Sequence, residues 1–188
     1  MPLMVHIDHP PPMLDEVLIR MRRGDILTHF FRPFPNCPTT AEGGVRASVL
    51  DARRRGVIFD IGHGMGSFAF ATARTMLGNG FIPDCISSDV HALCIDGPAF
   101  DLLTTMSKLL CLGLPLIEVV RAATINPANA LLRPDLGTFK QGSAGDASVL
   151  SLEEGAFDYV DSTGEHFEGS AKLTARGVVM GGRWWDGG

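Results

Sequence analysis

Short apolar runs alternate with longer helix-like segments through the first two-thirds of the chain, and this alternation constrains the fold more than any other feature. Strands that alternate with helices imply right-handed crossovers and a parallel sheet. The runs show no polar alternate face, which is the pattern of strands covered on both faces. The sequence therefore predicts an α/β fold. The predicted strands are residues 3–7 (LMVHI), 25–31 (DILTHFF), 57–64 (VIFDIGHG) and 84–92 (DCISSDVHA).

A helix is predicted after each of these strands. Glycine stops predict helix ends near Gly24, Gly56 and Gly113, and Ser67 is a suitable N-cap. Pro115 fits the first turn of a further segment, which forms either one helix or a broken pair. The predicted helical ranges are 13–24, 41–56, 67–80, 99–113 and 115–132.

After about Arg133 the chain changes to short strand-like stretches joined by glycine turns, such as FDYVDSTG and KLTARGVVMGGRWW. Stretches of this kind predict a small β segment. The sequence thus divides into 1–132 and 133–188. Trp184 and Trp185 are either core residues of the small sheet or an exposed apolar patch.

Composition excludes several classes of function. The 188 residues carry a formal net charge of -5, and nucleic-acid binding would need a basic face. The longest apolar run, 109–117, is broken by glycine and proline and is too short to span a membrane, and no signal peptide is recognisable. The four cysteines form no C-x-x-C pair, which argues against a disulfide scaffold or a zinc ribbon. We therefore expect a cytoplasmic protein without nucleic-acid or membrane partners.

Each predicted strand carries a chemically capable side chain at or near its end. These residues are His6, His29, His63 and Asp89. A (β/α)8 barrel spends about 31 residues per strand–helix unit, and its strands all end on one face. The intervals here suit consecutive units, so the four side chains are expected to point at a common volume. Taken singly, each is more often a hydrogen-bonded strand-end residue than a ligand, and their recurrence in four successive units carries the argument.

Neutral imidazole nitrogens and a carboxylate are the groups that bind a divalent ion such as Zn²⁺. The facial triad of a non-haem iron enzyme is a further match for His6, His29 and Asp89, although no motif in the sequence indicates iron. Asp60 is either a partner of a ligand or a plain strand-end acceptor.

Several of these stretches resemble the amidohydrolase superfamily, in particular its dihydroorotase-like amidohydrolases and deacetylases. The motifs are MVHI, GDILTH, FDIGHGMGSFAF, ISSDVHA and ATINPANAL. The resemblance implies that 1–132 is the C-terminal half, strands five to eight, of a metal-dependent (β/α)8 TIM barrel. The tail 133–188, with GSAGDASVLSL, resembles part of the family's small β-sandwich.

The resemblance also implies roles for the site residues. His6 and His29 are metal ligands on strands five and six, and Asp89 on strand eight is both a ligand and the catalytic proton acceptor. His63 is a substrate contact, whereas His9 is a residue of the rim. The implied cofactor is a divalent metal, Zn²⁺ before others, with one or two ions in a complete site. The implied substrate is a small acyl amide, cyclic amide or acyl ester.

The chain departs from the family pattern in two ways. It has no H-x-H pair, and its lysines, Lys108, Lys140 and Lys172, all follow the fourth predicted strand. A barrel without its first four strands leaves open sheet edges that invite pairing. We therefore expect the chain to need a missing N-terminal half or self-association. The alternative is a catalytically inactive, truncated remnant that acts as an interaction or scaffold module.

Overall fold

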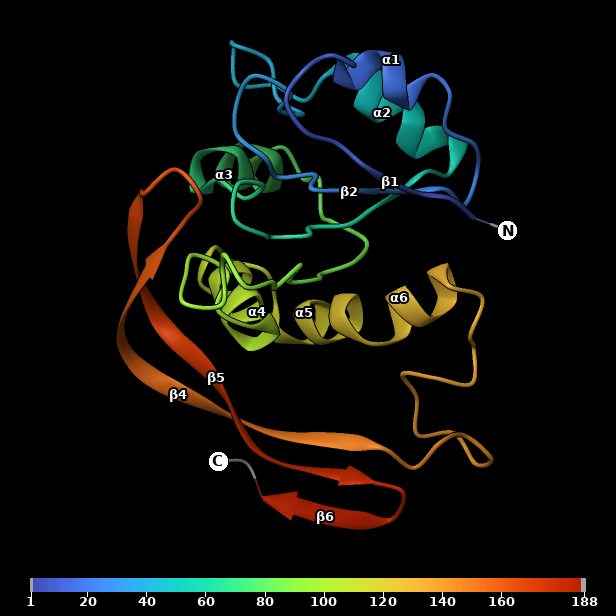
Figure 1. Cartoon of the computed structure of the whole chain (residues 1–188), viewed down its shortest axis with the longest axis vertical. Helices are drawn as coiled ribbons and strands as arrows, with labels where there is room; N and C mark the ends of the chain where they lie inside the picture. The colour runs from blue at the N-terminus through green and yellow to red at the C-terminus, as the bar shows by residue number, and fades with distance from the viewer. Residues whose placement is uncertain (1, 187–188) are drawn as a thin grey trace.

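The computed structural model describes residues 2–186, which form two sheets and a set of helices between and around them (Figure 1). Three short strands make a parallel sheet in the order β1-β2-β3. They are β1 (Met4–His6), β2 (Ile26–Thr28) and β3 (Ile58–Phe59). The predicted α/β character is confirmed for this part of the chain, because sequential strands are neighbours and run in the same direction.

The helices begin later and end earlier than the sequence predicts. They are α1 (Leu14–Leu18), α2 (Ala47–Arg55), α3 (Phe70–Gly78), α4 (Leu102–Cys111), α5 (Leu116–Ala123) and α6 (Ile125–Ala130). The predicted helix 13–24 is wrong after Leu18, because the Asp25 carboxylate accepts the backbone N–H groups of Leu3 and Arg22 and fixes a turn instead. Helix α2 ends as predicted at Gly56, whose φ of 87° is the left-handed conformation that favours glycine. The last predicted segment is a broken pair, interrupted at Thr124.

The fourth predicted strand is wrong as a regular strand. Residues 84–92 contribute one isolated parallel bridge, between Asp60 and Cys85. The segment still runs beside the end of β3, since the N–H groups of His63 and Gly64 donate to the carbonyls of Ser87 and Ser88. A regular ladder does not form because Gly62 and Gly64 have positive φ, 48° and 52°, and take the chain out of strand geometry.

Aromatic side chains dominate the core around the parallel sheet. Phe59 of β3 is fully buried, and its ring centroid lies 4.3 Å from that of Phe30 and 5.3 Å from that of Phe81. Full burial of one such side chain contributes about 1.5–3 kcal/mol to folding. This packed layer joins β3 to the segment that follows β2.

The C-terminal part is one long antiparallel ribbon rather than several short strands. It consists of β4 (Ala147–Val160), β5 (His166–Met180) and β6 (Arg183–Asp186) in the order β4-β5-β6. Register shifts at Val149/Leu150 and Glu154/Phe157 mark bulges. Bulges bend and twist a ribbon, which lets this one follow the helices beneath it. Within residues 2–186 this segment supplies a single sheet layer.

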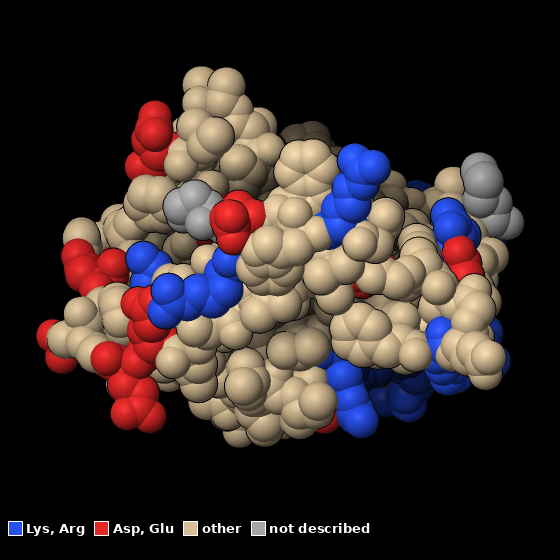
Figure 2. Space-filling model, turned by 90° about the horizontal axis from the view of Figure 1, so that it is seen from below, with Lys and Arg blue, Asp and Glu red and all other residues tan. Residues whose placement is uncertain are grey.

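The ribbon leaves apolar side chains uncovered. Trp184 and Trp185 are 51% and 55% exposed, so of the two alternatives the exposed apolar patch is the one observed. Figure 2 shows a broad area without charged side chains on the face that carries β6, with acidic residues gathered at one side. The other exposed apolar residues of the ribbon include Val149, Leu152, Val178 and Met180.

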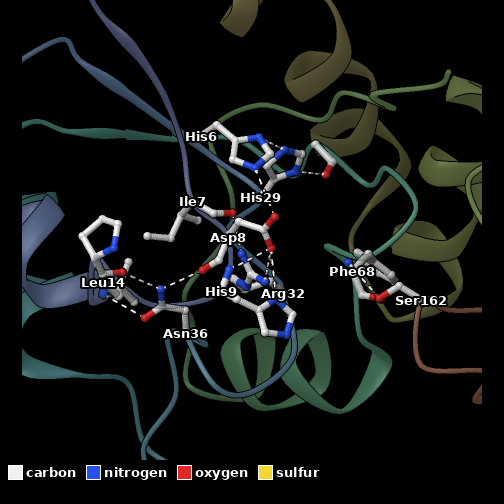
Figure 3. A network of polar contacts seen from close by, with 12 residues as sticks. His6, Ile7, Asp8, His9, Leu14, His29, Arg32, Asn36, Phe68 and Ser162 are labelled. Carbon is white, nitrogen blue, oxygen red and sulfur yellow. Dashed lines mark hydrogen bonds and ion pairs between the residues drawn. The ribbon is translucent and has the colours of Figure 1, made fainter.

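The turn between β4 and β5 is tied to the start of α3. The N-cap residue of α3, Ala69, has no side chain that accepts a hydrogen bond. The carboxylate of Asp161 takes that place, accepting the Phe70 N–H at 2.7 Å, and the Ser162 hydroxyl donates to the Phe68 carbonyl at 2.7 Å (Figure 3). The β4–β5 turn therefore caps a helix that lies 91 residues earlier in the chain.

The helices of residues 2–186 are all too short or too polar to qualify as membrane spans.

Candidate active site

Two of the predicted metal ligands meet at one edge of the parallel sheet (Figure 3). His6 ends β1 and His29 follows β2, and the parallel register places them side by side. The Nδ1 atom of His6 lies 2.7 Å from the Nε2 atom of His29. The ring planes stand at 81° with centroids 4.2 Å apart. The ends of β1 and β2 therefore place these two histidines side by side, as the sequence predicts.

The ring of His29 is held from its other side. Its Nδ1 atom lies 2.6 Å from the carbonyl oxygen of Gly62, to which it donates, so Nε2 presents a lone pair in the neutral ring. Burial lowers the pKa of His29, which favours that neutral form. Gly62 is required here, because a Cβ atom would lie 2.1 Å from the Thr28 Oγ1 atom. His29 itself has a φ of 63°, a rare conformation for a non-glycine residue that often marks functional positions.

Asp89 joins the same edge from the segment that runs beside β3. Its Oδ2 atom lies 3.7 Å from the Nε2 atom of His29, and its side chain is half exposed. Its φ of 46° is also left-handed. His6, His29 and Asp89 are thus gathered as the sequence predicts, and their roles as ligands or base stay predictions.

Asp60 is a buried hydrogen-bond acceptor between Thr28 and Ser87. The hydroxyls of Thr28 and Ser87 both donate to its Oδ2 atom at 2.6 Å, while Oδ1 is buried without a partner. Burial raises the pKa of Asp60. Asp60 therefore links the end of β2 to the segment that leads to Asp89, and its role as the partner of a ligand stays a prediction.

His63 is fully buried and makes its polar side-chain contacts with Gly64 and Lys108. Its Nδ1 atom is 2.9 Å from the Gly64 carbonyl, and its Nε2 atom is 2.8 Å from the Nζ atom of Lys108. Burial, and then the charge of Lys108, lower the pKa of His63 to about 4. Protein groups occupy both ring nitrogens, so the predicted substrate contact stays a prediction that would require these bonds to open.

Lys108 is a buried residue whose importance the sequence did not reveal. It lies on α4 with no exposed surface, and burial lowers its pKa to about 8. A single lysine within the apolar run MSKLLC is the only signal the sequence offers, since charged side chains are rarely buried without partners.

A second network fixes the chain just after His6 (Figure 3). The guanidinium of buried Arg32 donates to Asp8 at 3.0 Å, and its hydrogen bond holds the pKa of that carboxyl far below its usual range. The amide of Asn36 donates to the carbonyls of Asp8 and Pro12, at 2.8 Å and 2.9 Å. His9 is exposed and its Nδ1 atom lies 3.2 Å from Asp8, and its place on the rim stays a prediction.

The donor chemistry of the His6–His29 pair fits a divalent metal, but only in part. A tetrahedral zinc ion with Zn–N bonds of about 2.0–2.1 Å holds two nitrogens roughly 3.3 Å apart, so the rings would have to separate slightly. Donation of Nδ1 to a backbone carbonyl is the usual arrangement of a metal-binding imidazole. Residues 2–186 contain no group of three or more His, Cys, Asp or Glu side chains arranged to hold an ion. The chain thus offers two ligand nitrogens and a nearby carboxylate, which is less than a closed site.

Comparisons with known proteins agree with this arrangement. The amidohydrolase family model matches residues 69–185. The chain therefore belongs to the amidohydrolase family.

Individual relatives support the same assignment. A deacetylase of Enterococcus faecalis is 34% identical over 98% of this chain. The crystal structure of an adenine deaminase superposes with a TM-score of 0.96 at 34% identity, covering 99% of this chain and 51% of that one. A dihydroorotase structure gives 0.85 at 32% identity, over 99% of this chain and 48% of that one. The predicted resemblance to dihydroorotase-like amidohydrolases and deacetylases is confirmed. The chain spans about half the length of the relatives it matches, 51% of the deacetylase.

Proposed function

We propose that this chain supplies the C-terminal half of a metal-dependent amidohydrolase that hydrolyses C–N bonds in amides, cyclic amides or N-acyl groups, or acyl esters. The observation that carries the proposal is the convergence of His6 Nδ1 and His29 Nε2 at 2.7 Å, with Asp89 beside them. Relatives named as deacetylase, adenine deaminase and dihydroorotase support C–N bonds as the target.

The fold supports an assignment of 1–132 to strands five to eight of a (β/α)8 barrel. The strands β1, β2 and β3 are parallel and neighbours in chain order, and the segment from Cys85 continues the series. The side chains that carry the chemistry follow the carboxyl ends of these strands, where such barrels place their active sites. The ribbon 133–188 would be one layer of the small β-sandwich.

His6 and His29 would hold the metal ion, with Zn²⁺ as the first candidate because two imidazoles are borderline ligands. When bound, such an ion would lower the pKa of its water to about 7 and would polarise the acyl group. Asp89 accepts a proton from the attacking water on its carboxylate and returns it to the leaving nitrogen or oxygen. The C–N or C–O bond breaks and water adds across it, giving a carboxylic acid and an amine or alcohol, which stay in one molecule when the substrate is a cyclic amide.

Zinc binding tests this assignment directly. We expect the chain to bind one zinc ion weakly, and His29→Ala to weaken that binding by at least about tenfold, because even the partners of ligands contribute 10–100-fold. The measurement is competition with a fluorescent chelator. His166→Ala is the matched control, since His166 is exposed and paired with Asp158 on the ribbon. Zinc binding that His29→Ala leaves unchanged, or none at all, would favour the inactive scaffold module.

The open side of the sheet is the proposed contact for the missing half. Among the described strands, β1 pairs only with β2, so its outer edge carries unpaired backbone groups. A cavity of about 350 Å³ lies between β1 and α1 and is lined by Leu3, Val5, Val17 and Met21 among others. The proposed occupant is the other half of the barrel, and a second copy of the chain would take its place in its absence. The four free cysteines fit a proposed cytoplasmic location.

Met4→Lys is expected to reduce self-association of the chain. Met4 is exposed on β1, and a lysine on an edge strand opposes pairing with another strand. The measurement is sedimentation velocity over a range of protein concentrations. Ile19→Lys is the control, because Ile19 is also exposed but lies at the end of α1. Equal effects of the two variants would show that the β1 edge is not the contact.

A further inference from the structure

Lys108 is a fully buried charged residue that the proposed chemistry does not use. Its Nζ atom meets three acceptors: His63 Nε2 at 2.8 Å, the Pro98 carbonyl at 2.6 Å and the Val160 carbonyl at 2.7 Å. An ammonium has three N–H donors and no acceptor, so the charged form is satisfied completely. The three acceptors lie in the loop after β3, in the loop after Asp89 and at the end of β4. One side chain of α4 thus joins three segments that are distant in sequence.

The donor role of Lys108 fixes the state of His63. Since Nε2 accepts from an ammonium, the neutral ring must carry its proton on Nδ1, which donates to the Gly64 carbonyl at 2.9 Å. The ring also stacks on Phe68, with centroids 4.7 Å apart and planes at 19°. His63 therefore has one position, one tautomer and one orientation.

The turn 62–64 carries this constraint to the active-site residues. The Gly62 carbonyl accepts the proton of His29 Nδ1, and so sets the direction of His29 Nε2. On the same turn, a Cβ atom built on Gly64 would lie 2.8 Å from Asp89 Oδ2, so the backbone there abuts that carboxylate. One side of the turn is held by Lys108 and His63, and the other side touches His29 and Asp89.

We infer that Lys108 is a positioning residue, which acts through His63 and the turn 62–64 to orient His29 and to seat Asp89. It also ties the end of β4 to the site, since Val160 shares the same ammonium. The inference rests on the proposed function for the roles of His29 and Asp89. The hydrogen bonds of Lys108, His63 and His29 to one another and to the turn 62–64 do not depend on those roles.

Histidine side-chain NMR on the whole chain tests the inference, using ¹⁵N-labelled protein at neutral pH. In the wild-type chain we expect His63 as the neutral tautomer with its proton on Nδ1. A proton on Nε2 would exclude donation from Lys108 and overturn the inference without any variant. In Lys108→Met we expect the ring nitrogen resonances of His29 to shift or broaden, and zinc affinity to fall by roughly tenfold.

Ser107→Ala is the matched structural control. Ser107 is the buried neighbour of Lys108 on α4, and its hydroxyl accepts the Leu173 N–H at 2.9 Å without touching His63. We expect this variant to lower the melting temperature and leave the His29 resonances in place. If Lys108→Met does not fold, His63→Phe carries the test, because it keeps the stacked ring and removes both nitrogens. A folded Lys108→Met or His63→Phe whose His29 resonances match those of Ser107→Ala would overturn the inference.

These outcomes separate the inference from the proposed function. A wild-type chain that binds no zinc, combined with a His29 shift in Lys108→Met, would remove the proposed function and keep the positioning role. Zinc binding that depends on His29, combined with unchanged His29 resonances in Lys108→Met, would support the proposed function and remove the positioning role.

Discussion

The isolated 188-residue chain is expected to hydrolyse N-acetyl amino acids and acetyl esters no faster than its own His29→Ala variant, with or without added zinc. The reason is that residues 2–186 bring together two imidazoles and a carboxylate but no full set of metal ligands. Catalytic zinc sites use three protein ligands and a water. The measurement is product formation by the pure chain over a panel of such substrates. Robust zinc-dependent turnover that His29→Ala abolishes would contradict the need for a second half.

Activity is expected to appear when the chain is produced together with a complementary half. The part of the Enterococcus faecalis deacetylase that this chain does not match is a suitable source, since the chain covers 51% of that protein. In such a complex Asp89→Asn is expected to lower kcat by about 10²–10⁴-fold, the usual contribution of a general acid–base residue. Asp158→Asn, on the ribbon and exposed, is the control. A complex that shows no turnover but binds zinc through His29 would point to a substrate outside the tested panel.

Acid is expected to destabilise the chain through His63. Its pKa in the folded chain is lowered to about 4, against 6.5 for the unfolded chain, so the unfolded chain binds the proton more readily. The contribution of His63 to stability is therefore full above pH 6.5 and is lost as the pH falls towards 4. Between about pH 7 and about pH 4.5 the loss is about 2 kcal/mol, since each unit of pKa difference corresponds to about 1.4 kcal/mol.

Urea unfolding at several pH values measures this loss. His63→Phe is expected to remove that part of the pH dependence, because phenylalanine keeps the stack on Phe68 and has no proton to bind. Other groups titrate in the same range, so the difference between the two proteins is the relevant quantity. Parallel curves for wild type and His63→Phe would show that His63 is protonated in the folded chain as easily as in the unfolded one.

The sequence predicted the parallel sheet and the placement of three site residues, because both depend on local periodicity and on strand ends. Apolar runs with a polar residue after them define where a strand stops, and parallel strands stop at the same edge. His6, His29 and Asp89 are gathered for that reason. The family relationship follows from the same motifs, since they contain the residues at those edges.

Features that depend on the burial of a side chain or on contacts with distant segments could not be predicted from the sequence. The position of a lysine in a helix does not show whether its amine reaches solvent, so the Lys108–His63 pair was missed. The fourth predicted strand does not form a regular ladder, because its neighbour bends at Gly62 and Gly64. The residue preferences of 84–92 alone contain no information on that bend. The ribbon of β4 and β5 was read as separate strands, because glycine can mark either a turn or a bulge. Buried Arg32, with its bond to Asp8, gave no signal at all in FFRPFPN.

The hydrogen bond from the Phe70 N–H to Asp161 has a consequence for how the molecule comes apart. The first turn of α3 takes a hydrogen-bond acceptor from the turn between β4 and β5. We therefore expect that the parts on either side of residue 133 do not fold independently of each other. Removing the ribbon would strip a helix start of its acceptor and uncover α4, so the two parts are expected to melt in a single cooperative transition.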